Sequence, residues 1–365
     1  MIKKSIMVNG IPHIVIADPE ATLAEILRSQ LGLTGTKVGC NEGICGSCSV
    51  ILDGKLVRSC VTKFKKIPEW ACVTTVEGIG TPEKLHPIQK ALVLYGAAQC
   101  GFCMPGFVVS AKALLEQNPS PKREDVRDWF QKNLNACRCT GYKPIVDAVM
   151  DAAAVMRGDQ PEESLDYHLP VDGRIWGGKY PRPSAVAKVT GTAEYGADLG
   201  KRLPSNTLQC ALVQAKVSHA NILNIDTSEA EKMPGVYKVV THRDIKGKNR
   251  INGLVTWASN KCDGWDRPIL ADSKVFQYGD AIAIVCADTK EQALAAAEKV
   301  KVDLEVLPAY MNALEAMADD AIEIHPGTPN VYFTQGVVKG QDTKPLMASA
   351  AFVAEGSYYT QRQPH

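Results

Sequence analysis

The stretch VGCNEGICGSCSV, residues 38–50, places Cys40, Cys45 and Cys48 within nine positions and separates them with glycines. A fourth cysteine, Cys60, follows the segment SVILDGKLVRS, so the complete spacing is C-x4-C-x2-C-x11-C. Glycine reaches positive φ without steric cost, and a glycine-rich loop can therefore wrap closely and turn its N–H groups towards sulfur. The loop is suited to presenting several thiolates to one compact centre.

The spacing of this first cysteine group is typical of a plant-type [2Fe-2S] cluster, which is held by C-x4-C-x2-C and a distant fourth cysteine. Structural zinc sites use paired C-x2-C knuckles, which the four-residue gap does not supply. We therefore predict that Cys40, Cys45, Cys48 and Cys60 are the ligands of a [2Fe-2S] cluster. Zinc binding and free thiols remain as alternatives.

A second cysteine group, Cys100, Cys103, Cys137 and Cys139, has the spacing C-x2-C-x33-C-x-C. Two cysteine pairs could hold structural zinc, although a single intervening residue is cramped for a zinc knuckle. Because an iron–sulfur loop precedes it, a second [2Fe-2S] centre is the preferred interpretation. Two one-electron centres in one short stretch of chain indicate a path for single electrons.

The composition limits the class of protein. The chain has 365 residues and a formal net charge of +1 at pH 7. Its length predicts several domains, because single cores rarely grow to this size. The balanced charge gives no field to attract nucleic acid or an anionic membrane, and no apolar run reaches membrane-spanning length. Because the sequence also lacks a signal-peptide core, we expect a cytoplasmic protein without nucleic-acid or membrane partners.

The number of cysteines also indicates a function class. The chain has 12 cysteines and no recognisable export signal, which favours metal or redox chemistry over structural disulfides. The cysteines outside the two groups lie among apolar residues, and we expect them to be small buried hydrophobes. They are Cys72, Cys210, Cys262 and Cys286.

Residues 1–80 predict strands arranged around one helix. Asn9-Gly10 and Asp53-Gly54 are typical of two-residue hairpin turns, because both positions of such a turn need positive φ. Asp18 is expected to cap a helix with apolar residues at helical spacing up to Gly32. Residues 71–79 are expected to form a closing strand. This segment therefore predicts a small α+β domain.

Residues 81–158 change to helical periodicity and predict four short helices. Each cysteine pair of the second group stands just before a helix start, so two similar halves could each supply two ligands. Proline, glycine and charge in residues 159–190 predict a surface linker. Residues 191–310 alternate strands and helices as a separate α+β domain, and residues 311–365 lead to an expected strand at the end of the sequence.

Both cysteine motifs, together with QCGFCMPGF at 99–107 and CRCTGYKPI at 137–145, resemble the iron–sulfur portion of the molybdenum hydroxylases, the xanthine oxidase family. VTGTAEYGADL at 189–199 resembles the opening of the family's molybdenum-binding portion, and EGSYYTQRQPH at 355–365 resembles the start of its second half. Xanthine dehydrogenases carry a flavin domain between the two portions, whereas here a linker joins them. The arrangement is similar to the flavin-free bacterial aldehyde oxidoreductases of sulfate reducers.

The resemblance implies a multidomain α+β fold. It implies a β-grasp, ferredoxin-like [2Fe-2S] domain at 1–80 and a four-helix-bundle [2Fe-2S] domain at 81–158. After the linker at 159–190 it implies the first α+β domain of the molybdenum portion at 191–310. Residues 311–365 would then be a connecting segment and the truncated start of the molybdenum-binding core.

The resemblance also implies cofactors and an activity. The cofactors are two [2Fe-2S] clusters and molybdopterin cytosine dinucleotide with molybdenum, without FAD, and Gln99 and Cys139 would touch the pterin. The family hydroxylates aldehydes to carboxylic acids with oxygen from water. Electrons pass to the second cysteine group, then to the first, and then to an external flavodoxin or ferredoxin. A homodimer is a further family expectation.

The family places its catalytic glutamate far beyond residue 365, so no catalytic residue is expected within this chain, which we interpret as part of a longer one. A non-catalytic two-cluster electron carrier is the alternative function, and a zinc-stabilised scaffold is a third. A cluster of bases surrounds Cys60 and could dock an acidic electron acceptor. An ordinary solvated sheet edge is an equally strong interpretation of these bases. They are Lys55, Arg58, Lys63, Lys65 and Lys66.

Overall fold

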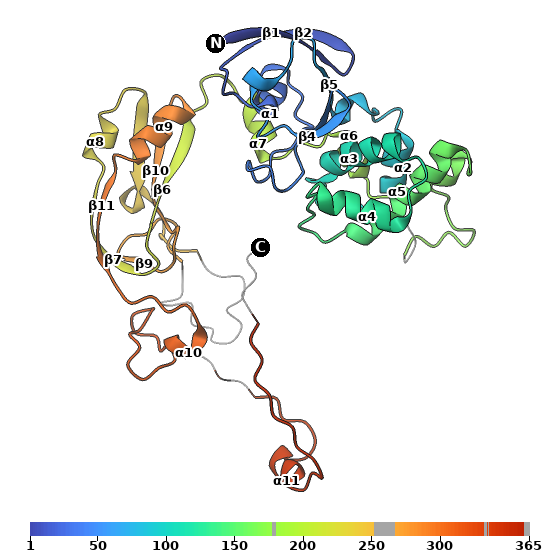
Figure 1. The fold of residues 1–365 in the computed structure, drawn as a ribbon. Helices are drawn as coiled ribbons and strands as arrows, with labels where there is room; N and C mark the ends of the chain where they lie inside the picture. The colour runs from blue at the N-terminus through green and yellow to red at the C-terminus, as the bar shows by residue number, and fades with distance from the viewer. Residues whose placement is uncertain (177–179, 252–266, 332–333, 335, 361–365) are drawn as a thin grey trace. The chain divides into compact units, whose positions relative to one another are not determined.

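The computed structural model describes residues 1–176, 180–251, 267–331, 334 and 336–360. The chain forms two compact units, Met1–Leu203 and Pro204–His365 (Figure 1). Among the described residues, no helix combines the length and the apolar character that crossing a bilayer requires.

The first unit begins with a mixed five-stranded sheet in the order β2-β1-β5-β3-β4. The predicted hairpin turns are confirmed: Asn9 and Gly10 have φ of 51° and 80°, and Asp53 and Gly54 have φ of 47° and 77°. The strand expected at residues 71–79 is shorter than predicted, because Val76–Gly78 form a 3-10 turn. It lies in the middle of the sheet, where β5 pairs in parallel with β1 and antiparallel with β3. The strands are β1 Ile2–Val8, β2 Ile11–Ala17, β3 Ser49–Leu52, β4 Lys55–Arg58 and β5 Cys72–Thr74.

The helix against this sheet begins later than the sequence predicts. Thr22, not Asp18, caps helix α1 (Leu23–Glu25), which continues as the π-helical turn η1 (Ile26–Gln30). The Thr22 hydroxyl accepts a hydrogen bond from the Glu25 N–H at 3.2 Å, and the Glu25 carboxylate accepts one from the Thr22 N–H at 2.7 Å. This reciprocal capping box satisfies two N–H groups at once, whereas Asp18 only accepts a bond from the Glu20 N–H in the preceding turn.

The four helices expected in the second segment are present. They are α2 Pro87–Leu94, α3 Met104–Gln117, α4 Arg123–Lys132 and α5 Tyr142–Arg157. Residues Ala185–Thr190, within the expected linker, form a further helix, α6, which packs against α2 and α3. Ala185 and Val189 are fully buried in the same core as Ile88 and Phe107. The end of the expected linker therefore belongs to the packing of this unit.

Gly106, in the first turn of α3, lies directly against the loop of the first cysteine group. A Cβ atom at this position would lie 2.3 Å from the Gly46 carbonyl oxygen and 2.9 Å from the Ser47 Cα. Both neighbours are backbone atoms, which cannot turn away as a flexible side chain could. The loop and α3 therefore approach this closely only because position 106 lacks a side chain.

Gly106→Ala is expected to push the loop away from α3 and to lower the free energy of unfolding by about 1–3 kcal/mol, the usual cost of overpacking. Denaturant unfolding of the variant and the native protein measures the change. Gly196→Ala is the matched control, because a Cβ at Gly196 meets no atom within 4 Å. If Gly106→Ala and Gly196→Ala changed the free energy of unfolding equally, the loop and α3 would not be as close at Gly106 as the structure shows.

The second unit contains two three-stranded sheets, in the orders β6-β10-β8 and β11-β7-β9. Helix α9 (Lys290–Ala297) packs on β6 and β10. The strands are β6 Gln209–Gln214, β7 Ala220–Asp226, β8 Val236–Thr241, β9 Lys274–Val275, β10 Ala281–Ala287 and β11 Lys301–Val306. The short helices are α7 Gly196–Leu199, in the first unit, and α8 Ser228–Glu231, α10 Ala313–Ala316 and α11 Thr343–Ala348, in the second.

The strand expected at the end of the sequence is not formed by its described part. Residues 351–360 have no regular secondary structure, and residues 361–365 lie outside the described residues. Phe352, Tyr358 and Tyr359 are exposed there. An isolated strand leaves its N–H and C=O groups unpaired. Residues with high strand propensity therefore do not form a strand unless a neighbouring strand pairs with them.

Candidate iron–sulfur centres

The structure brings the four thiols of the first cysteine group together. Cys48 and Cys60 are buried, and Cys40 and Cys45 are half-buried. The thiol of Cys40 lies against that of Cys45, the thiol of Cys48 lies against that of Cys60, and Cys60 is also near Cys40. The four thiols of the first group therefore lie together, three of them on one loop and Cys60 just after β4.

The backbone of the loop favours a negatively charged sulfur. The Cys40 Sγ accepts hydrogen bonds from the N–H groups of Glu42 at 3.3 Å and Ile44 at 3.4 Å. Burial raises the pKa of Cys40, but these N–H groups and Cys45 outweigh it and lower the pKa to about 7. Burial and the neighbouring Cys48 raise the pKa of Cys60 to about 12. N–H groups aimed at sulfur are the surroundings that a thiolate ligand needs.

The second cysteine group is also assembled, at the starts of two helices. Cys103 directly precedes α3, and the loop with Cys137 and Cys139 precedes α5. The thiol of Cys100 lies against that of Cys139, the thiol of Cys103 lies against that of Cys137, and Cys139 also contacts Cys137. Burial raises the pKa of Cys103, whereas contacts with Cys100, its backbone first, lower the pKa of Cys139.

The arrangement of the thiols distinguishes between kinds of metal centre. Within the described ranges, no three His, Cys, Asp or Glu side chains group around a point where one metal ion could sit. Each cysteine group instead gathers four thiols in mutual contact, and Cys139 contacts both Cys100 and Cys137. In a [2Fe-2S] cluster each of the two irons takes two ligands, whereas tetrahedral zinc needs all four at one point. Both donor sets therefore fit a [2Fe-2S] cluster.

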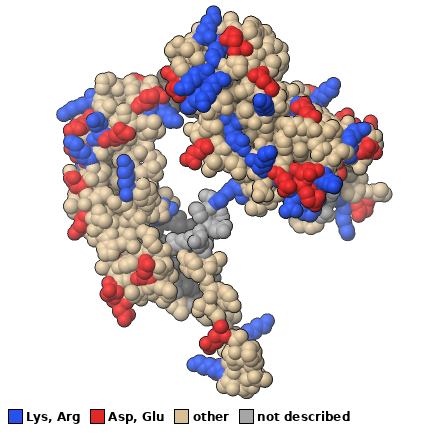
Figure 2. All heavy atoms as spheres, in the orientation of Figure 1, with Lys and Arg blue, Asp and Glu red and all other residues tan. Residues whose placement is uncertain are grey.

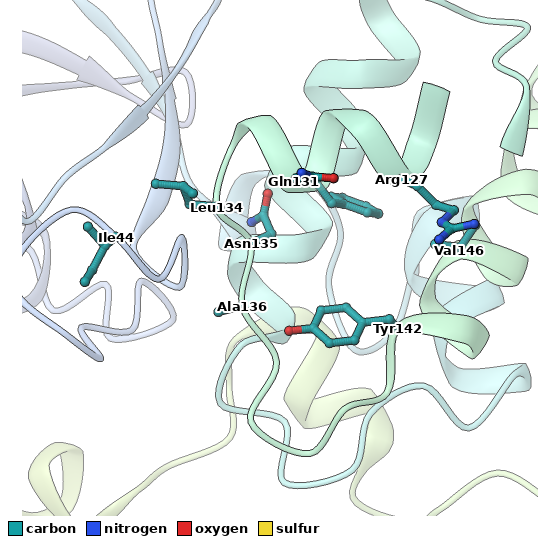
Figure 3. Close-up of a pocket in the computed structure, with 9 residues that line it drawn as sticks. Ile44, Arg127, Gln131, Leu134, Asn135, Ala136, Tyr142 and Val146 are labelled. Atoms are coloured by element: carbon teal, nitrogen blue, oxygen red, sulfur yellow. The ribbon is translucent and has the colours of Figure 1, made fainter. Parts of the chain in front are cut away.

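One backbone hydrogen bond joins the two cysteine groups. The N–H of Ala136, next to Cys137, donates to the carbonyl oxygen of Cys45 at 3.0 Å. A cavity of about 460 Å³ adjoins this contact, and Figure 3 shows Ile44 from the loop facing Leu134 and Tyr142 from the helical side. The two groups are thus in direct contact through the protein backbone.

A buried ion cluster that the sequence analysis missed lies beside the first cysteine group. Lys37 and Asp198 are only 1% and 3% exposed. The Asp198 carboxylate lies 2.8 Å from the Lys37 Nζ and 2.5 Å from an Arg28 guanidinium nitrogen. Burial raises the pKa of Asp198, but the hydrogen bonds from Lys37 and Arg28 hold it below the ordinary value of a carboxyl group. The ion cluster ties the segment after α6 to the loop that precedes Cys40.

Tyr195 connects the same segment to the second cysteine group. Its hydroxyl donates to the Cys100 carbonyl oxygen at 2.8 Å, and its ring lies 5.0 Å from the Lys37 Nζ. Phe102 packs edge-on against this ring at 5.1 Å. Burial and the neighbouring thiols Cys100 and Cys103 raise the pKa of Tyr195 to about 12. One segment therefore holds the surroundings of both cysteine groups.

Gln99 lies next to Cys139. The side-chain N–H of Gln99 donates a hydrogen bond to the Cys139 carbonyl oxygen at 3.3 Å. The backbone carbonyl oxygen of Gln99 accepts a hydrogen bond from the Lys188 Nζ at 2.6 Å. The side chain is half-buried. Gln99 and Cys139 therefore present a shared surface on which a ligand could rest.

The expected burial of the scattered cysteines is wrong for Cys72 and Cys210, which are exposed. Strand side chains alternate between faces, and the neighbours Val73 and Ala211 take the buried positions. Cys286 is half-buried. Cys262 lies outside the described residues.

The basic residues near Cys60 are not all free to meet a partner. Arg58 donates from its guanidinium to the Asn133 carbonyl oxygen and so joins β4 to the helical part. Lys65 forms an exposed ion pair with Glu20. Lys55 and Lys66 are exposed and Lys63 is half-buried. Figure 2 shows Lys and Arg side chains gathered over the N-terminal sheet, with some Asp and Glu among them.

Comparisons with known proteins agree with this picture. The family model of the 2Fe-2S iron-sulfur cluster binding domain matches residues 6–77, and that of the [2Fe-2S] binding domain matches residues 75–150. Residues 190–308 match the a/b hammerhead domain of aldehyde oxidase and xanthine dehydrogenase. The chain thus contains two [2Fe-2S]-binding domains and a domain of the molybdenum enzymes.

The chain is 68% identical over 365 residues to the aldehyde oxidoreductase of Megalodesulfovibrio gigas, a match that covers 100% of this chain and 40% of that protein. It is 46% identical over 145 residues to the nicotine 6-hydroxylase small subunit of Paenarthrobacter nicotinovorans, covering 40% of this chain and 86% of that subunit.

The solved structure of the aldehyde oxidoreductase from Desulfovibrio gigas superimposes with a TM-score of 0.90 at 68% identity, covering 96% of this chain and 39% of that one. The chain therefore spans about two fifths of the length of the aldehyde oxidoreductases that it matches. With its two [2Fe-2S]-binding domains and its hammerhead domain, the chain belongs to the molybdenum hydroxylase, or xanthine oxidase, family.

Proposed function

We propose that this chain is the iron–sulfur part of a molybdenum-dependent aldehyde oxidoreductase. The observation that carries the proposal is that the four thiols of each cysteine group lie together, with a backbone hydrogen bond between the groups. The identity of 68% along the whole chain to an aldehyde oxidoreductase supports the substrate class. The hammerhead match at residues 190–308 favours an enzyme over a mere electron carrier, which has no need of such a domain.

In this proposal the eight group cysteines hold two [2Fe-2S] clusters. Cys40, Cys45, Cys48 and Cys60 would hold the first cluster. Cys100, Cys103, Cys137 and Cys139 would hold the second. The bonds from the Glu42 and Ile44 N–H groups stabilise negative charge on the Cys40 sulfur.

Gln99 and Cys139 form the proposed contact with the molybdopterin cytosine dinucleotide. When bound, this cofactor with its molybdenum supplies the hydroxylation of an aldehyde to a carboxylic acid with oxygen from water. The second cysteine group then stands on the cofactor side and the first on the acceptor side, and no flavin takes part. The Ala136–Cys45 hydrogen bond keeps the backbones of the two groups in contact.

The full-length native protein tests the proposal directly. Iron analysis should find about four irons per chain, and electron paramagnetic resonance after reduction should show two distinct cluster signals. Metal analysis should find molybdenum, and the protein should oxidise aldehydes with a dye as acceptor. A colourless zinc protein contradicts the cluster assignment, and two clusters without molybdenum or aldehyde turnover indicate the electron-carrier alternative.

Gln99→Ala should reduce molybdopterin content and aldehyde turnover while leaving the iron content unchanged, because its contact with Cys139 shapes the proposed pterin surface. Cytosine-nucleotide release and iron analysis on the same sample measure the two effects. Gln117→Ala, an exposed glutamine at the end of α3, is the matched control. Unchanged cofactor content in the Gln99 variant removes this residue from the site.

The proposed electron acceptor is a flavodoxin or ferredoxin, which is acidic and would meet the lysines near Cys60. Raising the ionic strength is expected to slow its reduction, because salt screens attraction between exposed charges. Lys55→Glu with Lys66→Glu should slow it further at low salt, while reduction of a neutral dye stays constant. Rates that are indifferent to salt would rule out docking at these lysines. A homodimer and a cytoplasmic location complete the proposal, and gel filtration tests the former.

A further inference from the structure

Two cysteines that belong to neither cluster group face each other on the second unit. Cys210 lies on the edge strand β6 and Cys286 on the central strand β10, and the antiparallel register places them directly opposite. Their Sγ atoms are 3.6 Å apart. Cys210 is exposed and Cys286 is half-buried, so at least one of the two thiols can be reached by a small reagent.

The antiparallel register of Cys210 and Cys286 is compatible with a disulfide. Directly opposed residues in an antiparallel pair have Cα atoms about 4.5–5.5 Å apart, within the range of about 4.4–6.8 Å that disulfides use. The sulfurs, 3.6 Å apart, need to approach by only about 1.5 Å to reach bonding distance.

The two thiols have different surroundings, which suggests different roles. Burial and the nearby Cys210 raise the pKa of Cys286, while the charge of Lys238 on the adjacent strand β8 opposes this. Cys210 stands at the sheet edge, where an incoming molecule reaches it first. Cys210 is therefore the attacking thiol, and Cys286 is placed to resolve the mixed disulfide.

We propose that Cys210 and Cys286 are a site of reversible oxidation by low-molecular-weight disulfides such as oxidised glutathione. The Cys210 thiolate attacks one sulfur of glutathione disulfide, which forms a mixed disulfide and releases one glutathione thiolate. The Cys286 thiolate then attacks the Cys210 sulfur and releases the second glutathione. The two protein thiols lose two electrons and two protons, and glutathione disulfide takes up both. The product joins the edge strand β6 covalently to β10.

The test uses the full-length enzyme with its cofactors. The protein is incubated with glutathione disulfide, free thiols are blocked with iodoacetamide, and its tryptic peptides are mapped without reduction. We expect a linked peptide pair containing Cys210 and Cys286, lighter by about 2 Da than the two reduced peptides together. Dithiothreitol should restore both thiols, and an unchanged visible spectrum should show that the iron–sulfur centres survive.

Two variants separate the proposed pair from unspecific oxidation. Cys210→Ser should abolish the linked peptide, whereas Cys72→Ser should leave it in place, because Cys72 is an exposed cysteine outside the pair. Glutathione that stays attached to Cys210 would overturn the proposal, since Cys286 then fails to resolve it. Complete alkylation of both thiols after glutathione disulfide treatment would overturn it equally.

Discussion

Replacing Cys103 with alanine should remove one cluster and leave the other. The side chain is buried just before α3 and lies against Cys137, so its loss would leave the proposed second cluster short of a ligand. Iron content is expected to fall from about four to about two per chain, and one of two paramagnetic signals should disappear. Aldehyde should then reduce neither the remaining cluster nor an external acceptor at an appreciable rate.

Cys48→Ala makes the complementary test, because it affects the first cysteine group. The other signal should disappear, while aldehyde still reduces the cluster of the second group. Reduction of flavodoxin or ferredoxin should stop, because the proposed cluster that passes electrons to the acceptor is missing. The two variants together therefore reveal the order of the centres, which total activity alone does not.

Cys72→Ser is the control for both variants, because Cys72 is exposed and belongs to neither group. It should keep both signals and the full iron content. If Cys103→Ala and Cys48→Ala each removed both signals, the variants would have damaged the fold and not one centre. Circular dichroism distinguishes this case. If each kept all of its iron in a folded protein, the ligand assignment would be wrong.

The sequence was sufficient for those parts of the fold that depend on local chemistry. Asn9-Gly10 and Asp53-Gly54 turn as expected, because a two-residue hairpin demands positive φ at both positions and few other dipeptides tolerate it. The spacing of the cysteine groups also indicated which thiols would meet. The structure brings Cys103 and Cys137 together although 33 residues lie between them in the motif.

The errors arose where two local signals competed or where a strand face had to be chosen. Asp18 and Thr22 are both good cap residues, and the reciprocal bond of Thr22 with Glu25 decided between them. Cys210 lies in a largely apolar run in which each residue could be buried, so only the sheet determines which alternate residues face outwards. Such choices depend on tertiary packing, which pattern analysis does not contain.

The ion cluster of Lys37, Arg28 and Asp198 had no signal in the sequence at all. Lys37 and Asp198 are 161 positions apart, and neither belongs to a recognisable motif of charged residues. A lysine is ordinarily expected at the surface, so its burial becomes evident only with the partner carboxylate in place. Removing one partner of such a buried ion pair is strongly destabilising.

Asp198→Asn should therefore destabilise the first unit strongly. The substitution keeps the shape of the side chain but leaves Lys37 buried without a counter-charge, and breaking a buried ion pair on one side costs about 3–5 kcal/mol. Denaturant unfolding measures the loss. Glu20→Gln removes one partner of the exposed pair with Lys65, and should change stability by less than about 1 kcal/mol.

A second substitution identifies the cause of the Asp198 effect. Lys37→Met in the Asp198→Asn background removes the unpaired buried charge, and should recover part of the lost stability because apolar residues can replace a buried ion pair. If the double variant is no more stable than Asp198→Asn, the buried charge of Lys37 is not the origin of the loss. The contacts of the Asp198 carboxylate with the Tyr195 N–H and Arg28 would then account for it.

Acid should reduce the difference between the native protein and Asp198→Asn. The pKa of Asp198 is lower in the folded protein than in the unfolded chain, so its stabilisation is present above the ordinary carboxyl pKa of about 3.9. This contribution is lost as the pH falls through the lower, folded value, because the native state must then bind the proton too. Unfolding free energies measured from neutral to acidic pH should therefore converge for the two proteins. A constant difference over that range would mean that the carboxylate charge does not hold the segment against Lys37.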